Sequence, residues 1–95
     1  MQVIIKSVHF TAGTDLESYA TEKMERLTKF NDQIIRAHVT LSLEPGSSPE
    51  KRSCEVLLSI PGEDPYLKKT AATFEEAINQ AADALEKVLR RMKPR

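Results

Sequence analysis

Hydrophobic residues recur along the chain with two different periods, and these periods predict four strands and two helices. Apolar and polar residues alternate in the strand segments, whereas apolar residues recur every three to four positions in the helical segments. The predicted strands cover residues 2–10, 34–44, 52–60 and 66–72, and the predicted helices cover residues 14–30 and 73–92. Turn or loop segments rich in Gly, Pro, Ser and Asp separate most of these elements.

The second and third strand segments show the clearest alternation. One side of each segment is apolar and is expected to face the core. These inward residues are Ala37, Val39, Leu41, Leu43, Cys54, Val56, Leu58 and Ile60. The opposite side, which includes His38, Thr40 and Glu55, is mostly polar. We therefore expect one face of the sheet to remain in contact with water.

Local signals also fix where the two helices begin. Thr73 and Glu76 have the spacing of a capping box at the start of the second helix, and Pro94 ends that helix. Thr14 or Asp15 is expected to cap the first helix. The apolar stripe of the second helix is long and continuous: Phe74, Ala77, Ile78, Ala81, Leu85, Val88, Leu89 and Met92.

The element order β-α-β-β-β-α predicts an α+β fold with two layers. Short connections make the last three strands an antiparallel meander, and each helix has one apolar face. Both helices should therefore pack on the same face of a four-stranded sheet, an arrangement like that of double-stranded-RNA-binding domains. The length of 95 residues suggests a single domain over residues 1–95.

The composition excludes several classes of function but does not identify one. The single cysteine, Cys54, cannot form an internal disulfide, and its place on an inward face indicates a buried structural residue. His9 and His38 each stand alone, and no metal-binding, nucleotide-binding or catalytic spacing occurs. We therefore predict no enzymatic activity, no metal, no cofactor and no small-molecule substrate. The absence of a signal peptide or a membrane-span pattern indicates a soluble, cytoplasmic protein. We also expect the protein to be monomeric when free.

Basic residues are distributed unevenly, although 14 basic and 14 acidic residues give a net charge of zero. On a helical wheel of the first helix, Lys23 lies near the edge of the apolar stripe, and Arg26 and Lys29 follow on the same flank. The opposite flank carries Glu17 and Glu25. The second helix begins with acidic residues and ends with bases, which the helix dipole explains in part.

A basic groove between the two helices is the strongest functional feature of the pattern. Lys68 and Lys69 precede the second helix, and five bases lie after Glu86, more than a helix dipole needs. With few aromatic residues nearby, such a groove indicates contact with phosphates rather than reading of bases. The candidate RNA-binding residues are Lys23, Arg26, Lys29, Lys68, Lys69, Lys87, Arg90, Arg91 and Lys93.

The chain resembles the ribosome hibernation-promoting factors, the family that includes the protein Y type inhibitors and the sigma-54 modulation proteins. The resemblance rests on "LESYATEKMERLTKF", on "AHVTLSLE", on the "KK" before "TFEEAIN", and on "AADALEKVLRRMK". It implies a partner in the small ribosomal subunit and its rRNA, and occlusion of the channel for mRNA and tRNA. It further implies inhibition of translation in stationary phase or starvation, as a stress response.

The resemblance has two departures. Glu75 stands where many members of the family have a tyrosine, and the chain resembles the short form, which lacks the domain that pairs ribosomes. The sequence also leaves an alternative open, a protein–protein interaction module that uses the open sheet face or an edge strand. The neutral net charge favours that alternative.

Overall fold

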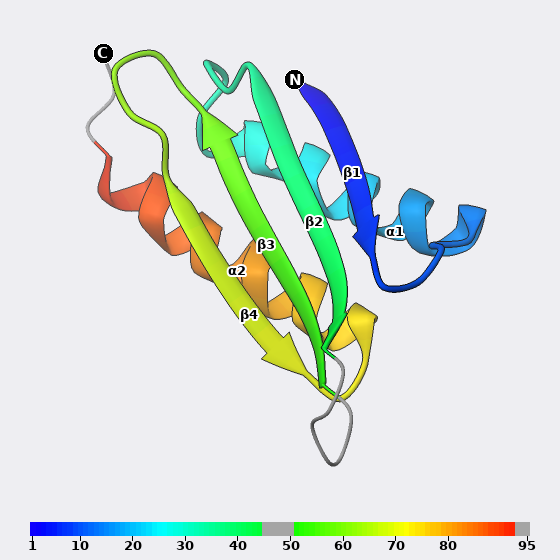
Figure 1. Cartoon of the computed structure of the whole chain (residues 1–95). Coiled ribbons are helices and arrows are strands. Elements are labelled where there is room, and N and C mark those ends of the chain that lie inside the picture. Colours follow the sequence, from blue (N-terminus) through cyan, green and yellow to red (C-terminus); the bar gives the residue numbers. More distant parts are fainter. Residues whose placement is uncertain (45–50, 93–95) are drawn as a thin grey trace.

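The protein has two layers, a four-stranded sheet and two helices that cover one of its faces (Figure 1). The structure is a computed structural model and describes residues 1–44 and 51–92. The elements are β1 (Gln2–Val8), α1 (Thr14–Glu25), a 3₁₀ turn η1 (Arg26–Lys29), β2 (Arg36–Glu44), β3 (Lys51–Ser59), β4 (Tyr66–Ala71) and α2 (Phe74–Arg91). The predicted α+β order is therefore confirmed.

The strands lie in the order β1-β2-β3-β4. β1 pairs with β2 in parallel, and β2, β3 and β4 form the predicted antiparallel meander. The two outer strands, β1 and β4, are the edges of the sheet. Because every element reverses the direction of the one before it, α1 and α2 run parallel to each other, and both end at the same end of the molecule (Figure 1).

The core lies between the sheet and the helices. The predicted inward residues of β2 and β3 are buried, except that Leu43 is half-buried, and Ala77, Ile78, Ala81, Leu85 and Leu89 of α2 cover them. Met24, which the apolar stripe of the first helix had not included, is fully buried. Burial of large aliphatic side chains such as these is the main favourable contribution to folding.

The helix boundaries contain one confirmed and two wrong predictions. The Thr73 hydroxyl accepts a hydrogen bond from the Glu76 backbone N–H at 3.1 Å, so this predicted cap is confirmed. The first helix is capped by Gly13 without a side-chain hydrogen bond, so Thr14 and Asp15 are not its cap. That helix also stops at Glu25 and tightens into η1, where sequence spacing had predicted a regular helix to Phe30. The loop at residues 45–50 and Pro94 lie outside the described residues.

Candidate nucleic-acid interface

The parallel helices bring basic residues from distant parts of the sequence to one end of the molecule. We call this surface the basic end, and define it by Lys23, Arg26 and Lys29 at the end of α1 and in η1, and by Lys87, Arg90 and Arg91 in the last turns of α2. The carbonyl groups at a helix C-terminus carry partial negative charge, which favours bases there. Because the two helices end side by side, both C-termini favour basic residues at the same end of the molecule.

Lys23 is accommodated against an aromatic ring. Its side chain is half-buried, and its Nζ lies 5.5 Å from the centroid of the Tyr19 ring. The ring face attracts the ammonium, and the aliphatic stem covers apolar surface, so the lysine needs no buried counter-ion. The prediction that Lys23 lies at the edge of the apolar stripe is therefore confirmed.

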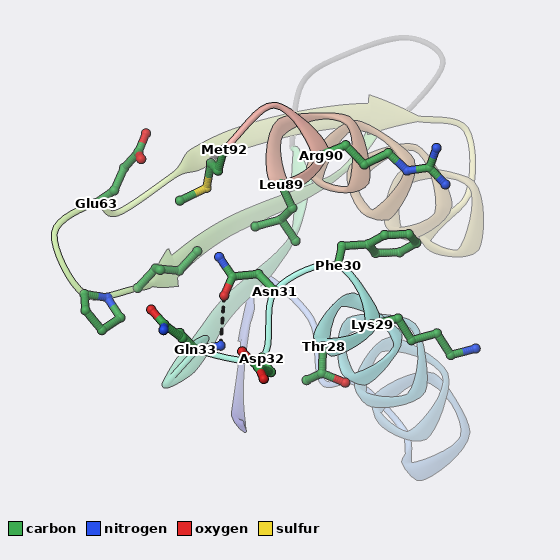
Figure 2. A pocket seen from close by; sticks show the side chains of 12 residues that line it. Thr28, Lys29, Phe30, Asn31, Asp32, Gln33, Glu63, Leu89, Arg90 and Met92 are labelled. Carbon is green, nitrogen blue, oxygen red and sulfur yellow. Dashed lines mark hydrogen bonds between the residues drawn. The ribbon is translucent and has the colours of Figure 1, made fainter. Parts of the chain in front are cut away.

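A second cation lies over a second ring where the two helices meet. The Arg90 guanidinium of α2 lies 5.1 Å from the centroid of the Phe30 ring, which follows η1. In Figure 2, the Lys29 and Arg90 side chains extend in the same direction on either side of Phe30. Tyr19 and Phe30 thus hold cations in place, a contribution of aromatic residues that the sequence reading had missed.

A hollow of about 700 Å³ lies beside this contact at the ends of the helices (Figure 2). Leu89 and Ile60 supply apolar lining, and Lys29 and Arg90 supply positive charge. Asp32 and Glu63 also line the hollow, so it is mixed in charge rather than uniformly basic. Asn31 also lines the hollow, and its side-chain oxygen accepts a hydrogen bond from the Gln33 backbone N–H at 2.8 Å.

Two of the arginines at the basic end have a carboxylate partner four residues earlier in the chain. Arg26 contacts Glu22 at 3.2 Å and Arg90 contacts Glu86 at 3.1 Å. Exposed pairs of this kind contribute little to stability, so a phosphate can replace the carboxylate at small cost. Within residues 1–44 and 51–92, Lys29, Lys87 and Arg91 have no carboxylate oxygen within 4.0 Å.

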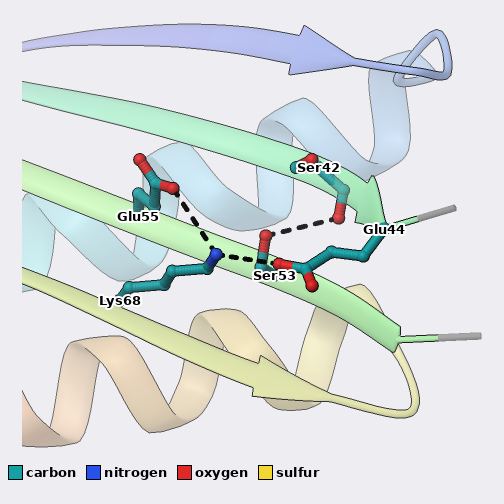
Figure 3. A network of polar contacts seen from close by, with 5 residues as sticks. All are labelled: Ser42, Glu44, Ser53, Glu55 and Lys68. Atoms are coloured by element: carbon teal, nitrogen blue, oxygen red, sulfur yellow. Dashed lines mark hydrogen bonds and ion pairs between the residues drawn. The ribbon is translucent and has the colours of Figure 1, made fainter. Parts of the chain in front are cut away.

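Two of the predicted residues that the structure describes, Lys68 and Lys69, do not lie at the basic end. Lys68 is on the open face of β4, where its Nζ contacts Glu44 at 2.8 Å and Glu55 at 3.8 Å (Figure 3). Lys69 lies on the helix-bearing face of β4, nearer to the start of α2 than to its end. Lys93 lies outside the described residues.

The ion pairs of Lys68 hold it on the open face. A hydrogen bond from Lys68 lowers the pKa of the Glu44 carboxyl, and the same hydrogen bond raises the pKa of Lys68. Ser53 lies on this face too, yet it is fully buried, and its hydroxyl donates to the Ser42 carbonyl at 3.5 Å (Figure 3). Alternation had placed Ser53 on the solvated side, and only a contact between distant residues could reveal its burial.

The structure also describes the surroundings of the single cysteine, Cys54. Cys54 is fully buried, and desolvation raises the pKa of its thiol to about 12, which confirms a buried structural cysteine. Among the described residues, no group of three or more His, Cys, Asp or Glu side chains could hold a metal ion. None of the helices in residues 1–44 and 51–92 combines the length and apolarity needed to span a membrane.

Comparison with known proteins identifies the family of this chain. Residues 3–95 match the family model described as Sigma 54 modulation protein / S30EA ribosomal protein. The chain belongs to this family. A relative in the family, the ribosome hibernation promotion factor of Deinococcus radiodurans, is 37% identical over 81 residues, which are 84% of this chain and 42% of that protein. The chain thus spans less than half the length of this relative.

Solved structures share the fold of this S30EA family chain. The N-terminal domain of Thermus thermophilus Protein Y has a TM-score of 0.84 at 24% identity, over 98% of this chain and 100% of that one. A ribosomal subunit interface protein from Coxiella burnetii has a TM-score of 0.83 at 15% identity, over 94% and 93%. The predicted family and the predicted α+β fold are confirmed.

Proposed function

We propose that this chain is a ribosome hibernation factor that binds the small ribosomal subunit through rRNA phosphates. It occludes the decoding channel for mRNA and tRNA, and so inhibits translation in the cytoplasm during starvation or stationary phase. The observation that carries the proposal is the convergence of basic residues from both helices at the basic end. Membership of the S30EA family and the name of the Deinococcus relative support the ribosome as the partner.

The chemistry of the basic end suits phosphates better than base edges. Lysine and arginine side chains on two rigid helices can contact several phosphates of a folded RNA at once, and such contacts set position rather than sequence preference. At the basic end, the rings of Tyr19 and Phe30 are already covered by Lys23 and Arg90. Stacking of bases on these rings would require the cations to leave.

Sedimentation with purified ribosomal subunits tests the proposal. The protein should travel with the small subunit at low salt and be released at high salt, because phosphate contacts release counter-ions. A variant with Lys23, Arg90 and Arg91 changed to Glu should fail to bind while keeping its circular dichroism spectrum. Full retention of that variant on the small subunit would contradict the assignment of the basic end.

A second candidate function rests on a different surface, the open face of the sheet. Ile4, His38, Leu57 and Tyr66 form one row across all four strands by register. Three of them are exposed apolar or aromatic residues, with 38% of Ile4, 39% of Leu57 and 60% of Tyr66 accessible. Such a row favours a protein-binding module, whose partner would survive nuclease treatment in a pull-down, whereas an rRNA-mediated partner would be lost.

A further inference from the structure

The hollow beside the basic end carries polar groups that a phosphate site does not need. Its volume of about 700 Å³ lies in the range of small-molecule sites in proteins, and the buried side chains of Ile60 and Leu89 give it an apolar lining. Asp32 and Glu63 also line it, and both are exposed. Carboxylates repel a phosphate, so the part of a ligand that lies against them must carry hydrogen-bond donors instead.

Asn31 presents a hydrogen-bond donor to the same hollow. Its side-chain oxygen accepts from the Gln33 backbone N–H at 2.8 Å, and this bond fixes which way the amide group points. The amide nitrogen therefore lies on the other side of the group, and Figure 2 shows it directed away from Gln33 and into the hollow. Within residues 1–44 and 51–92, this nitrogen donates to no other protein group, so it is available to a ligand.

The two carboxylates are acceptors without a cation. In that same part of the chain, neither Asp32 nor Glu63 has a lysine, arginine or histidine nitrogen within 4.0 Å. The backbone of Glu63 is also held in place, because its N–H donates to the Ile60 carbonyl at 2.9 Å and its carbonyl accepts from the Ile60 N–H at 3.1 Å. The hollow thus combines an amide donor, unpaired carboxylates and an apolar surface.

Among the bases of RNA, guanine fits this combination best. Its Watson–Crick edge presents the acceptor O6 beside two donors, N1–H and the N2 amine. An amide nitrogen donates to such an acceptor, and one carboxylate accepts from both donors at once, because its two oxygens lie side by side. Adenine and cytosine present one donor group on this edge, and uracil presents acceptors on both sides of its N–H. Unpaired bases of RNA are commonly recognised on this edge.

Positive charge at the same hollow suits the phosphate of such a nucleotide. Lys29 and Arg90 line the hollow, and their side chains extend in the same direction on either side of Phe30 (Figure 2). A phosphate accepts charge-assisted hydrogen bonds from both cations. Arg90 already covers the Phe30 ring, so the flat face of the base would lie on the aliphatic lining rather than on this ring.

We propose that the hollow binds a guanosine 5′-phosphate group. Asn31 donates to O6 of the base. The carboxylates of Asp32 and Glu63 accept from N1–H and the N2 amine, and Lys29 and Arg90 bind the phosphate. An unpaired guanosine of an RNA and a free guanine nucleotide share this chemistry. The RNA source rests on the proposed function, whereas binding of the nucleotide itself does not.

Titration of the ¹⁵N-labelled protein with mononucleotides tests recognition of the base. GMP should shift the side-chain amide resonances of Asn31. IMP is the matched probe, since it is the same purine nucleotide without the N2 amine, and it should bind about tenfold more weakly, the cost of one hydrogen bond to a charged group. Guanosine, which lacks the phosphate, should bind about fourfold more weakly than GMP, because each exposed ion pair contributes about a factor of two. Equal affinities for GMP and IMP would overturn the proposal.

Matched protein variants test the assigned acceptors. Asp32→Ala with Glu63→Ala should bring the ratio of the GMP and IMP affinities to about one, because the N2 amine loses its acceptor. Asp15→Ala with Asp64→Ala removes the same charge from residues that do not line the hollow, and should keep the ratio. The ratio is the measured quantity because both nucleotides carry the same phosphate. An unchanged ratio in the first variant, with the circular dichroism spectrum of the unmodified protein, would overturn the proposal.

Short RNAs identify the source of the nucleotide. A nonamer of adenosines with one central guanosine is compared with a nonamer of adenosines alone. Tighter binding of the first nonamer supports a guanosine of RNA as the ligand, and equal binding of the two, beside a preference for GMP over IMP, supports a free nucleotide. Failure to bind the small subunit would refute the proposed function and leave the preference for GMP unaffected. Salt-dependent subunit binding without that preference would refute only the guanosine site.

Discussion

The salt dependence of binding to the small subunit gives the most direct quantitative check on the basic end. If its bases all contact phosphates, the logarithm of the binding constant should fall with the logarithm of the salt concentration. The slope is about −0.7 to −0.9 per contact. Six contacts, one from each residue that defines the basic end, give a slope of about −4 to −5.

This slope translates into a large change in affinity over an accessible range. Between 50 and 200 mM salt the affinity should fall by about 250- to 1,000-fold. Changing Lys87→Gln with Arg91→Gln, two exposed bases without a carboxylate partner among the described residues, should make the slope shallower by about 1.4 to 1.8. The assay is retention of fluorescently labelled protein on purified small subunits across a potassium chloride series.

The matched control lies on the opposite face of the sheet. Lys6→Gln with Lys68→Gln removes the same amount of positive charge from the open face, and should leave the slope unchanged. A wild-type slope shallower than about −1 would refute the phosphate-dominated contact. An equal loss of slope in the Lys6 and Lys68 variant would instead refute the assignment of the contact to the helix ends, and would favour the open face.

Three further predictions concern the stability and reactivity of the fold. Burial raises the pKa of the Cys54 thiol from 9.0 to about 12. Below pH 9, the thiolate of Cys54 should therefore be about a thousandfold scarcer in the folded protein than in the unfolded chain. A thiol reagent should react with Cys54 only after denaturation, and fast labelling of the native protein would contradict this prediction. The same raised pKa means that the contribution of Cys54 to stability is complete below pH 9 and is lost as the pH rises toward 12, which urea unfolding at alkaline pH can follow. Thr73→Ala should lower the free energy of unfolding by about 1 kcal/mol, because it removes the hydrogen bond that caps α2. Thr14→Ala should leave the free energy of unfolding nearly unchanged, because the Thr14 side chain caps no helix. Equal losses of stability in denaturant melts of the two variants would contradict the assignment of the caps.

The fold could be predicted from the sequence because hydrophobic residues recur with clear periods in the strand and helix segments, and these periods depend only on residues close together in the chain. Alternation in residues 34–44 and 52–60 fixes which side of each strand is buried, and one register slip would expose the whole apolar set. The apolar stripe of α2 and the cap at Thr73 are equally local. The first helix was predicted less well, because its end depends on how η1 tightens against the core, and because Gly13 offers no side chain that marks a cap.

The candidate site was predicted only in part, and part of the missing information was in the sequence. Leu67 and Ala71 pack toward the helices, so alternation places Lys69 with them and Lys68 on the other face. The parallel direction of the helices also follows from the element order. Contacts between distant residues could not be predicted in this way. The Arg90 guanidinium over Phe30 and the Glu44 contact of Lys68 depend on packing that no local pattern encodes.

A net charge of zero does not oppose RNA binding when the charges are separated in space. Glu17 and Glu25 of α1 line its outer flank beside β1, and Glu75 and Glu76 lie in the first turn of α2, whereas the basic end collects positive charge from both helices. An RNA surface attracts the basic end and repels the flank of α1 that carries Glu17 and Glu25, which orients the bound protein.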